Sequence, residues 1–176
     1  MRERGLIQVY TGNGKGKSTA AIGQAVRAAG HGHKVAFISF FKDPDVFGYG
    51  EYRSMQQLGI ETFLFARKHP HFYKKLDHEE VCRECVSGLE CIKELLLDPS
   101  WDMLVLDELN IALRDGYLNE DEVIALLDAK PQRLELVLTG RGVPQRIADR
   151  ADLVSEVMEI KHPYSQGIQS REGIEY

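Results

Sequence analysis

Short apolar runs recur along the chain, separated by longer segments that mix apolar and polar residues. The runs are mostly continuous rather than alternating, which is typical of parallel strands covered on both faces. On this pattern we predict strands at residues 6–10, 34–41, 60–65, 102–108, 134–138 and 154–160.

The segments between these runs have the spacing of helices. The longest covers residues 77–98, where apolar side chains recur along one face at Val81, Cys85, Leu89, Ile92 and Leu96. We predict further helices at residues 20–29, in a short stretch ending at Leu58, from Asn119 onward, and at 144–150. Strands that alternate with helices indicate an α/β fold with a mostly parallel sheet and helices on both faces.

A glycine-rich segment joins the first predicted strand to the first predicted helix. This segment, the glycine loop, reads Thr-Gly-Asn-Gly-Lys-Gly-Lys-Ser-Thr over residues 11–19. Glycines allow backbone N–H groups to turn toward an anion, and the helix N-terminus adds about half a positive charge. Strand, glycine loop, Lys-Ser and helix follow the order of a phosphate-binding P-loop. We therefore predict a P-loop NTPase-like domain that binds nucleotide through Gly12, Asn13, Gly14, Lys15, Gly16, Lys17, Ser18 and Thr19.

The glycine loop departs from the common pattern G-x-x-x-x-G-K-[ST]. The first glycine of that pattern would fall at Thr11, and the glycines here occupy alternate positions instead. Lys15 adds a second lysine inside the loop. This spacing predicts that the phosphates are held in an unusual way, with Lys17 reaching them and Ser18 offering its hydroxyl to Mg²⁺.

Charged residues follow two other predicted strands. Asp107 and Glu108 end the strand at 102–108, and Arg141 lies in the polar loop after the strand at 134–138. Because ligands bind beyond the carboxyl ends of parallel strands, we expect all three side chains beside the glycine loop. Mg²⁺ prefers carboxylate and phosphate oxygens, so Ser18, Asp107 and Glu108 are the candidate metal ligands.

Composition narrows the class of protein. The 176 residues suffice for one domain, which we place at 1–176, and the net charge of −5 gives no basic field for nucleic acid. The sequence has neither a membrane-span-length apolar run nor a signal peptide, so we expect a cytoplasmic protein without membrane association. Three cysteines argue against a disulfide framework. His78, Cys82 and Cys85 share a helix face, but a fourth zinc ligand is not evident and core packing explains Cys85 better.

Several motifs together resemble the corrinoid adenosyltransferases that act on cob(I)yrinic acid a,c-diamide and cob(I)alamin. They include the glycine loop, Phe-Phe-Lys at 40–42, Gly-Glu at 50–51, Val-Leu-Asp-Glu-Leu at 105–109, Thr-Gly-Arg-Gly at 139–142 and parts of the tail from 154 to 176. The resemblance covers nearly the whole chain in order.

The resemblance implies a reaction and a set of roles. The family transfers the 5′-deoxyadenosyl group of Mg-ATP to Co(I) of a reduced corrinoid and releases triphosphate, with ATP reversed in the P-loop. Lys15, Lys17 and Glu108 are then the catalytic residues, and Arg141 contacts the nucleotide. The same resemblance implies an electron donor that reduces cobalt, and a homodimer. Since Co(I) is itself the nucleophile, the protein has to supply position and charge stabilisation.

The corrinoid contacts are expected after the third predicted strand. Family members carry Gly-Phe-Thr-Trp there, whereas this chain has a mixture of aromatic and basic residues, and it begins a few residues before its first strand. We predict that residues 65–73 form a lid over the corrinoid, with Phe65 and Phe72 as contacts. Two other functions stay open at this stage: a P-loop ATPase or nucleotide-dependent switch, and a nucleotide-binding module without chemistry.

Overall fold

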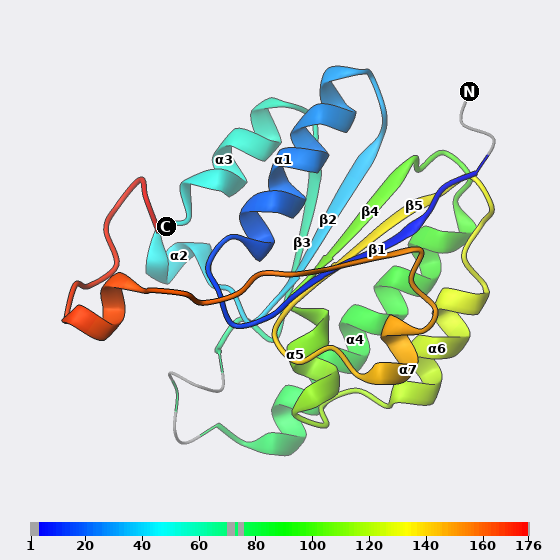
Figure 1. The fold of residues 1–176 in the computed structure, drawn as a ribbon. Helices are drawn as coiled ribbons and strands as arrows, with labels where there is room; N and C mark the ends of the chain where they lie inside the picture. The colour runs from blue at the N-terminus through cyan, green and yellow to red at the C-terminus, as the bar shows by residue number, and fades with distance from the viewer. Residues whose placement is uncertain (1–3, 70–72, 74–75, 176) are drawn as a thin grey trace.

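The computed structural model describes residues 4–69, 73 and 76–175. Six strands form one sheet in the order β3-β2-β4-β5-β1-β6, and every paired neighbour is parallel (Figure 1). The strands are β1 (Ile7–Thr11), β2 (Val35–Phe40), β3 (Glu61–Phe65), β4 (Met103–Asp107), β5 (Glu135–Thr139) and β6 (Leu153–Glu156). This confirms the α/β class with a parallel sheet.

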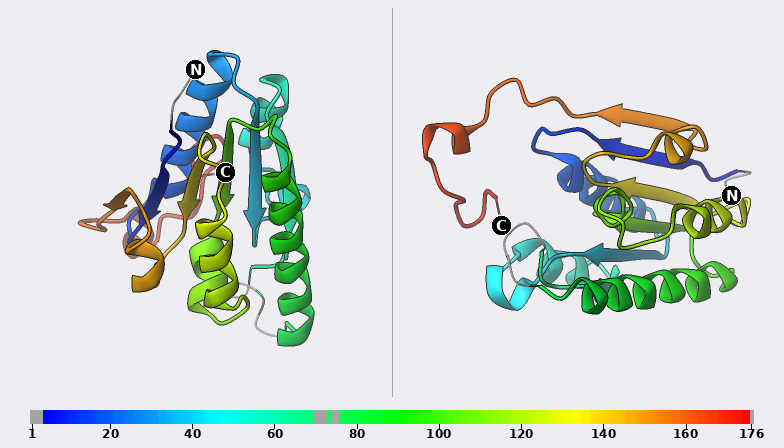
Figure 2. Two further views of the ribbon diagram at one scale, coloured as in Figure 1. Left: turned by 90° about the vertical axis from the view of Figure 1, so that its right-hand side faces the viewer. Right: turned by 90° about the horizontal axis from the view of Figure 1, so that it is seen from below.

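Helices cover both faces of the sheet. They are α1 (Lys17–Gly30), α2 (Pro44–Phe47), α3 (Gly50–Gln57), α4 (His78–Leu97), α5 (Leu109–Arg114), α6 (Glu120–Asp128) and α7 (Gln145–Ala148), followed by the 3₁₀ turn η1 (Pro163–Gln166). Helices α1 and α3 lie on one face, and α4, α5, α6 and α7 lie on the other (Figures 1 and 2). Within the described ranges, no helix combines the length and apolar character needed to cross a bilayer.

Strand β2 shows how the two-sided cover explains the continuous apolar runs. All six of its residues are buried. Ile38 and Phe40 pack in the layer that contains α4, whereas Phe37 packs in the layer that contains α1. A strand with water on one face would have alternated instead.

The order of the strands brings distant parts of the sequence to one edge. Strand β1 lies between β5 and β6, with Val9 opposite both Leu138 and Val154. Strand β4 lies between β2 and β5, with Asp107 opposite Ser39. Because all the strands point the same way, the segments that follow β1, β2, β4, β5 and β6 meet at their carboxyl ends.

The structure departs from the prediction after β6 and after β4. The last strand ends at Glu156 rather than at residue 160, because Val157 donates its N–H to Thr11 O and accepts from the N–H of Gly14, which ties the next residues to the glycine loop. Helix α5 was not predicted. It begins directly after Glu108, whose φ of 63° turns the chain from strand to helix without a connecting loop.

Candidate nucleotide-binding site

The glycine loop needs glycine at its alternate positions for two different reasons. A Cβ at Gly12 would stand 2.5 Å from Val157 O, and one at Gly14 would stand 2.6 Å from Met158 O. Gly16 has open space around it, but its φ is 123°, which disfavours other residues. The unusual spacing therefore follows from close packing of the loop against residues 157 and 158, combined with positive φ angles at Gly12 (95°) and Gly16 that favour glycine.

Helix α1 begins with free backbone donors. Gly16 gives it no side-chain cap, and its first turn contains no acidic residue. The first N–H groups of a helix have no partner within the helix, so this end is suited to an anion. Ser18 and Thr19 lie in this first turn, Ser18 half-buried and Thr19 exposed.

Lys17 is folded back over the glycine loop. It is 8 % exposed, and its Nζ donates a hydrogen bond of 2.7 Å to Gly14 O. Burial lowers the pKa of Lys17, and the charge of Arg141 lowers it further. The carboxylates of Glu108 and Asp107 oppose this shift without cancelling it. Lys17 is thus a partly desolvated ammonium that stands among charged groups at the loop.

The side chain of Lys15 contacts the C-terminal tail. Its Nζ lies 2.8 Å from Glu175 Oε1 and donates to Ile174 O at 3.3 Å. Glu175 is also bound by Arg171, and these two cations hold the pKa of Glu175 below its usual range, the arginine more than the lysine. These contacts tie the C-terminal tail to the glycine loop. Asn13, at the tip of the loop, is exposed.

Asp107 is fully enclosed and has a partner for each carboxylate oxygen. Thr139 donates its hydroxyl to Asp107 Oδ1 at 2.6 Å, and Lys42 Nζ lies 2.6 Å from Asp107 Oδ2. Lys42 also donates to Ser18 Oγ at 3.2 Å. Burial disfavours the charged form of Lys42, but the negative charges near it, chiefly that of Asp107, leave its pKa above the ordinary value.

Glu108 differs from Asp107 in having an oxygen without a partner. Its backbone N–H donates to Thr139 Oγ1 at 3.0 Å, which fixes the turn, while its buried Oε2 has no hydrogen-bond partner among the described residues. Burial, and after it the charge of Asp107, raises the pKa of Glu108. A buried carboxylate oxygen of this kind is suited to a cation.

Arg141 lies on the rim of the same site. Gly140 before it has a φ of 130°, and its carbonyl accepts from Asn110 Nδ2 at 3.2 Å. Arg141 is exposed, yet its charge shifts the pKa values of both Lys17 and Glu108. The loop after β5 therefore places an exposed cation close to the glycine loop and the carboxylates.

Phe65 is the last residue of β3, and it packs inward. Its ring centroid lies 6.2 Å from that of Phe40, and a Cβ on Gly88 of α4 would meet both rings. A contribution of Phe65 to corrinoid binding stays a prediction. Phe72, the other expected contact, lies outside the described residues, as does most of the segment 70–75.

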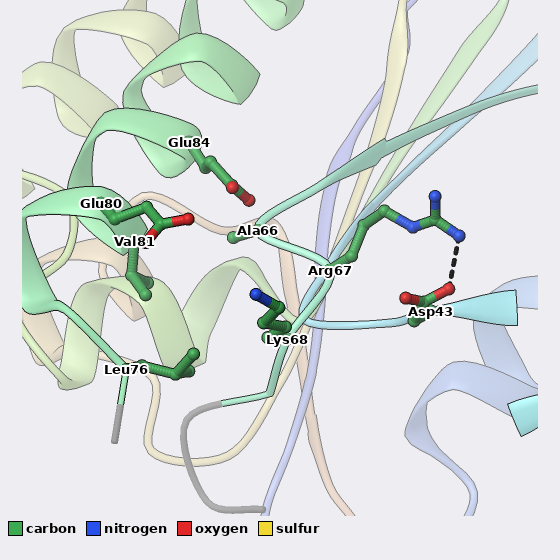
Figure 3. Close-up of a pocket in the computed structure, with 8 residues that line it drawn as sticks. All are labelled: Asp43, Ala66, Arg67, Lys68, Leu76, Glu80, Val81 and Glu84. Atoms are coloured by element: carbon green, nitrogen blue, oxygen red, sulfur yellow. Dashed lines mark hydrogen bonds and ion pairs between the residues drawn. The ribbon is translucent and has the colours of Figure 1, made fainter. Parts of the chain in front are cut away.

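A pocket of about 190 Å³ opens beside the end of β3 (Figure 3). It is lined by Asp43, Ala66, Arg67, Lys68, Leu76, Glu80, Val81 and Glu84. Arg67 pairs with Asp43 and Asp45, which join the segment after β3 to the segment after β2. The pocket thus lies at the carboxyl edge of the sheet, on the side away from β6.

The predicted site residues converge in part. The glycine loop, Ser18, the two carboxylates and Arg141 meet at one edge, whereas Phe65 faces the core. Sequence reasoning missed Lys42, although a single lysine directly after a buried apolar strand was a usable signal. Cys82 Sγ lies 3.4 Å from His78 Nδ1. The described residues nevertheless contain no group of three or more potential ligands with metal-binding geometry.

The parallel sheet and the glycine loop at the start of α1 define a class, the α/β proteins with a P-loop NTPase-like fold. Within that class, residues 3–176 match the family described as ATP:corrinoid adenosyltransferase BtuR/CobO/CobP. The chain belongs to this family.

Relatives that align with nearly the whole chain support its place in this family. The chain is 39 % identical over 174 residues to corrinoid adenosyltransferase CobA of Salmonella typhimurium, covering 99 % of this chain and 87 % of that protein. It is 37 % identical to the corrinoid adenosyltransferase of Escherichia coli K12, with the same coverage. It is 36 % identical to that of Pseudomonas aeruginosa, covering 99 % of this chain and 85 % of the relative.

Proposed function

We propose that this protein transfers the 5′-deoxyadenosyl group of ATP to the Co(I) centre of a reduced corrinoid and releases triphosphate. Family membership supports this activity, and one structural observation carries it. Cationic side chains and backbone donors surround the glycine loop. Because Co(I) is itself the nucleophile of this reaction, no protein side chain is needed in that role. A site of this kind stabilises a polyanionic leaving group.

The residues divide the work of binding and charge stabilisation. Lys17 and the first N–H groups of α1 would bind phosphate oxygens, with Lys15, Gly12, Asn13, Gly14, Gly16 and Thr19 completing the nucleotide site. Arg141 would approach the nucleotide from the rim. Holding C5′ in line with the corrinoid lowers the barrier by proximity, and fixed positive charge stabilises the departing triphosphate.

We propose that the site takes Mg²⁺ with the nucleotide. Ser18 Oγ and the unpartnered Glu108 Oε2 are hard oxygen donors of the type that Mg²⁺ binds together with phosphates. When bound, Mg²⁺ would supply positive charge against the triphosphate. Asp107 also belonged to the expected ligand set, but its Oδ2 lies 2.6 Å from Lys42 Nζ.

The pocket of Figure 3 supports a corrinoid site at the end of β3. It lies on the carboxyl edge that also carries the nucleotide site, and it combines the apolar Leu76 and Val81 with charged residues. A corrinoid joins a flat apolar macrocycle to polar side groups, which fits such a lining. Phe65 and Phe72 remain the proposed aromatic contacts.

Four further assignments accompany this proposal. Residues 1–176 are proposed to act as one domain, because all six strands share one sheet. A cytoplasmic location fits three free thiols. A homodimer fits the exposed apolar side chains of the edge strand β6, Leu153 and Val154. An electron donor is required because the acceptor cobalt has to be Co(I).

Product analysis under anaerobic conditions tests the proposal. The chain is incubated with ATP, Mg²⁺ and chemically reduced cobalamin, and the adenosylcobalamin spectrum and the phosphate products are recorded. We expect adenosylcobalamin and triphosphate in equal amounts, and none of either with Lys17→Ala, because that variant loses the charge-assisted hydrogen bonds to phosphate. ADP and inorganic phosphate without adenosylcobalamin would instead identify a hydrolase.

A further inference from the structure

We propose that Lys42 is a phosphate-binding lysine of the nucleotide site, and that Asp107 positions Lys42 rather than binding the metal ion. The inference rests on the proposed function, since it assigns roles within the same site. It adds a residue from the segment after β2 to a nucleotide site that was expected from the glycine loop and Arg141, and it removes Asp107 from the metal ligands.

The Asp107 carboxylate is enclosed by side chains that already occupy it. Its side chain is 0 % exposed, and its two oxygens are taken up by the Thr139 hydroxyl and the Lys42 ammonium, each at 2.6 Å. A buried carboxylate is stable when it is paired and hydrogen-bonded in this way. Ligation of a metal by Asp107 would require one of these partners to leave.

Lys42 lies between Asp107 and the first turn of α1. It follows Phe41, whose φ of 59° turns the chain sharply at the end of β2, and its side chain is 12 % exposed. Its Nζ lies 3.2 Å from Ser18 Oγ, in the first turn of α1. An ammonium has three donors, and Asp107 and Ser18 occupy two of them. Because Ser18 lies in the first turn of α1, directly after the glycine loop, we infer that the remaining donor of Lys42 is available to a phosphate bound there.

Glu108 completes the division of roles. Its Oε2 is buried and has no hydrogen-bond partner in the described part of the chain. Asp107 Oδ2 also lacks a hydrogen bond, but it is ion-paired with Lys42 Nζ at 2.6 Å, and Asp107 Oδ1 accepts from the Thr139 hydroxyl. The two adjacent carboxylates thus differ in what they can still bind. Glu108 has an oxygen available for a cation, and Asp107 holds the cation that the chain itself provides.

Binding measurements separate this arrangement from ligation by both carboxylates. The affinity for ATP is measured by calorimetry in EDTA and in excess Mg²⁺, for wild type, Lys42→Met, Asp107→Asn and the double variant. The affinity of the ATP complex for Mn²⁺ is measured by electron paramagnetic resonance for wild type, Asp107→Asn and Glu108→Gln. Neither measurement needs corrinoid, so the result is independent of whether adenosyl transfer occurs.

We expect Lys42→Met to weaken ATP binding about ten- to a hundredfold with or without metal, as for the loss of a charge-assisted hydrogen bond. Asp107→Asn should also weaken ATP binding, and the double variant should resemble Lys42→Met, because Asp107 acts through Lys42. Mn²⁺ affinity should stay within about twofold of wild type in Asp107→Asn and fall at least tenfold in Glu108→Gln.

Two results would overturn the inference. One is a loss of Mn²⁺ affinity in Asp107→Asn as large as in Glu108→Gln, which would make Asp107 a ligand. The other is unchanged ATP affinity in EDTA when Lys42 is replaced. If Lys42→Met fails to fold because it leaves a buried carboxylate unpaired, the double variant, which removes both charges, replaces it in the comparison.

Discussion

At the residue scale, Glu108 combines three features that seldom coincide: a left-handed backbone, a buried oxygen without a partner, and a like charge beside it. Each is unfavourable for stability. Burial and Asp107 both raise its pKa, so the folded chain disfavours the ionised form that a metal requires. The site is therefore less stable without a ligand than it would be with a neutral side chain.

We accordingly expect Glu108→Gln to melt at a higher temperature than wild type when nucleotide and metal are absent. The folded-state pKa of Glu108 is raised, so its ionisation destabilises the fold at pH values above the unfolded pKa of about 4.5. The advantage of Gln should be present at pH 7 and vanish as the pH falls below that value. Scanning calorimetry from pH 4 to pH 8 should show a rise in melting midpoint of about 2–4 °C for each kcal/mol by which ionised Glu108 destabilises the fold.

The same variant should lose Mg²⁺-dependent adenosyl transfer while it keeps its fold. A melting midpoint at or below that of wild type throughout the pH range would contradict the penalty for the ionised Glu108 side chain. Normal turnover at low Mg²⁺ would contradict its role toward the metal.

At the element scale, the glycine loop and the segment after β6 form one unit, because backbone atoms of residues 157 and 158 fill the space beside Gly12 and Gly14. The loop is thus shaped from outside as well as by its own glycines. Sequence reasoning identified the loop from its letters and its flanking elements. It could not identify the outer support, because contact between segments so distant in sequence leaves no local pattern.

Gly14→Ala tests this unit, with Gly23→Ala as a matched control in α1. A Cβ at Gly14 would stand 2.6 Å from Met158 O, whereas Gly23 has open space within 4 Å and lies in a helix. We expect Gly14→Ala to lower the melting midpoint and weaken ATP binding at least tenfold. Gly23→Ala should raise stability by about 0.5–1 kcal/mol and leave ATP binding unchanged. Equal effects of the two substitutions would show that the close approach is unimportant.

Strand β3 and helix α4 form a second unit, joined through Phe65 and Gly88. Phe65→Ala should lower the free energy of unfolding by roughly 2–3 kcal/mol, somewhat below the full range for a buried phenylalanine, since Phe65 is only partly buried. Urea titration measures this loss. Because Phe65→Ala also disturbs core packing, an increase in its corrinoid KM does not by itself identify a corrinoid contact. The corrinoid KM of Phe72→Ala should therefore be measured beside it. An unchanged urea midpoint in Phe65→Ala would show that its packing contributes little.

At the scale of the whole molecule, most of the fold could be predicted because β2, β4 and β5 are buried on both faces and therefore read as continuous apolar runs. The carboxylates and Arg141 could be placed because parallel strands end at one edge. Lys42 and Thr139 received no role, since their importance depends on meeting Asp107 across strands. The inward packing of Phe65 was equally inaccessible, because a strand end adjoining a basic loop reads as a surface.

The return of the tail to the glycine loop is a further long-range contact with a measurable effect. Glu175 binds Lys15 at a site that is partly exposed, so the pair should contribute little to stability. Removing the carboxylate should instead free Lys15 for phosphate. We expect Glu175→Gln to raise ATP affinity about two- to fivefold at low salt and to have no effect at high salt.

Glu172→Gln is the control, because it removes one negative charge from the same segment at an exposed position three residues before Glu175. It should leave ATP affinity unchanged at both salt concentrations. An equal rise in both variants would indicate a general effect of net charge, and a fall in Glu175→Gln would indicate that the carboxylate assists nucleotide binding.

The position of β1 between β5 and β6 also governs when the protein can mature during synthesis. The amide of Ile7 is bound by Asp152, 145 residues further along the chain, and both neighbours of β1 come from the last third of the sequence. At translation rates of about 5–20 residues per second, the first strand waits roughly seven to thirty seconds for its partners. Strands β2, β3 and β4 pair only with one another over that period. We therefore expect ATP to stabilise the nascent chain only after residues 153–157 have left the ribosome, because residues 157 and 158 support the glycine loop.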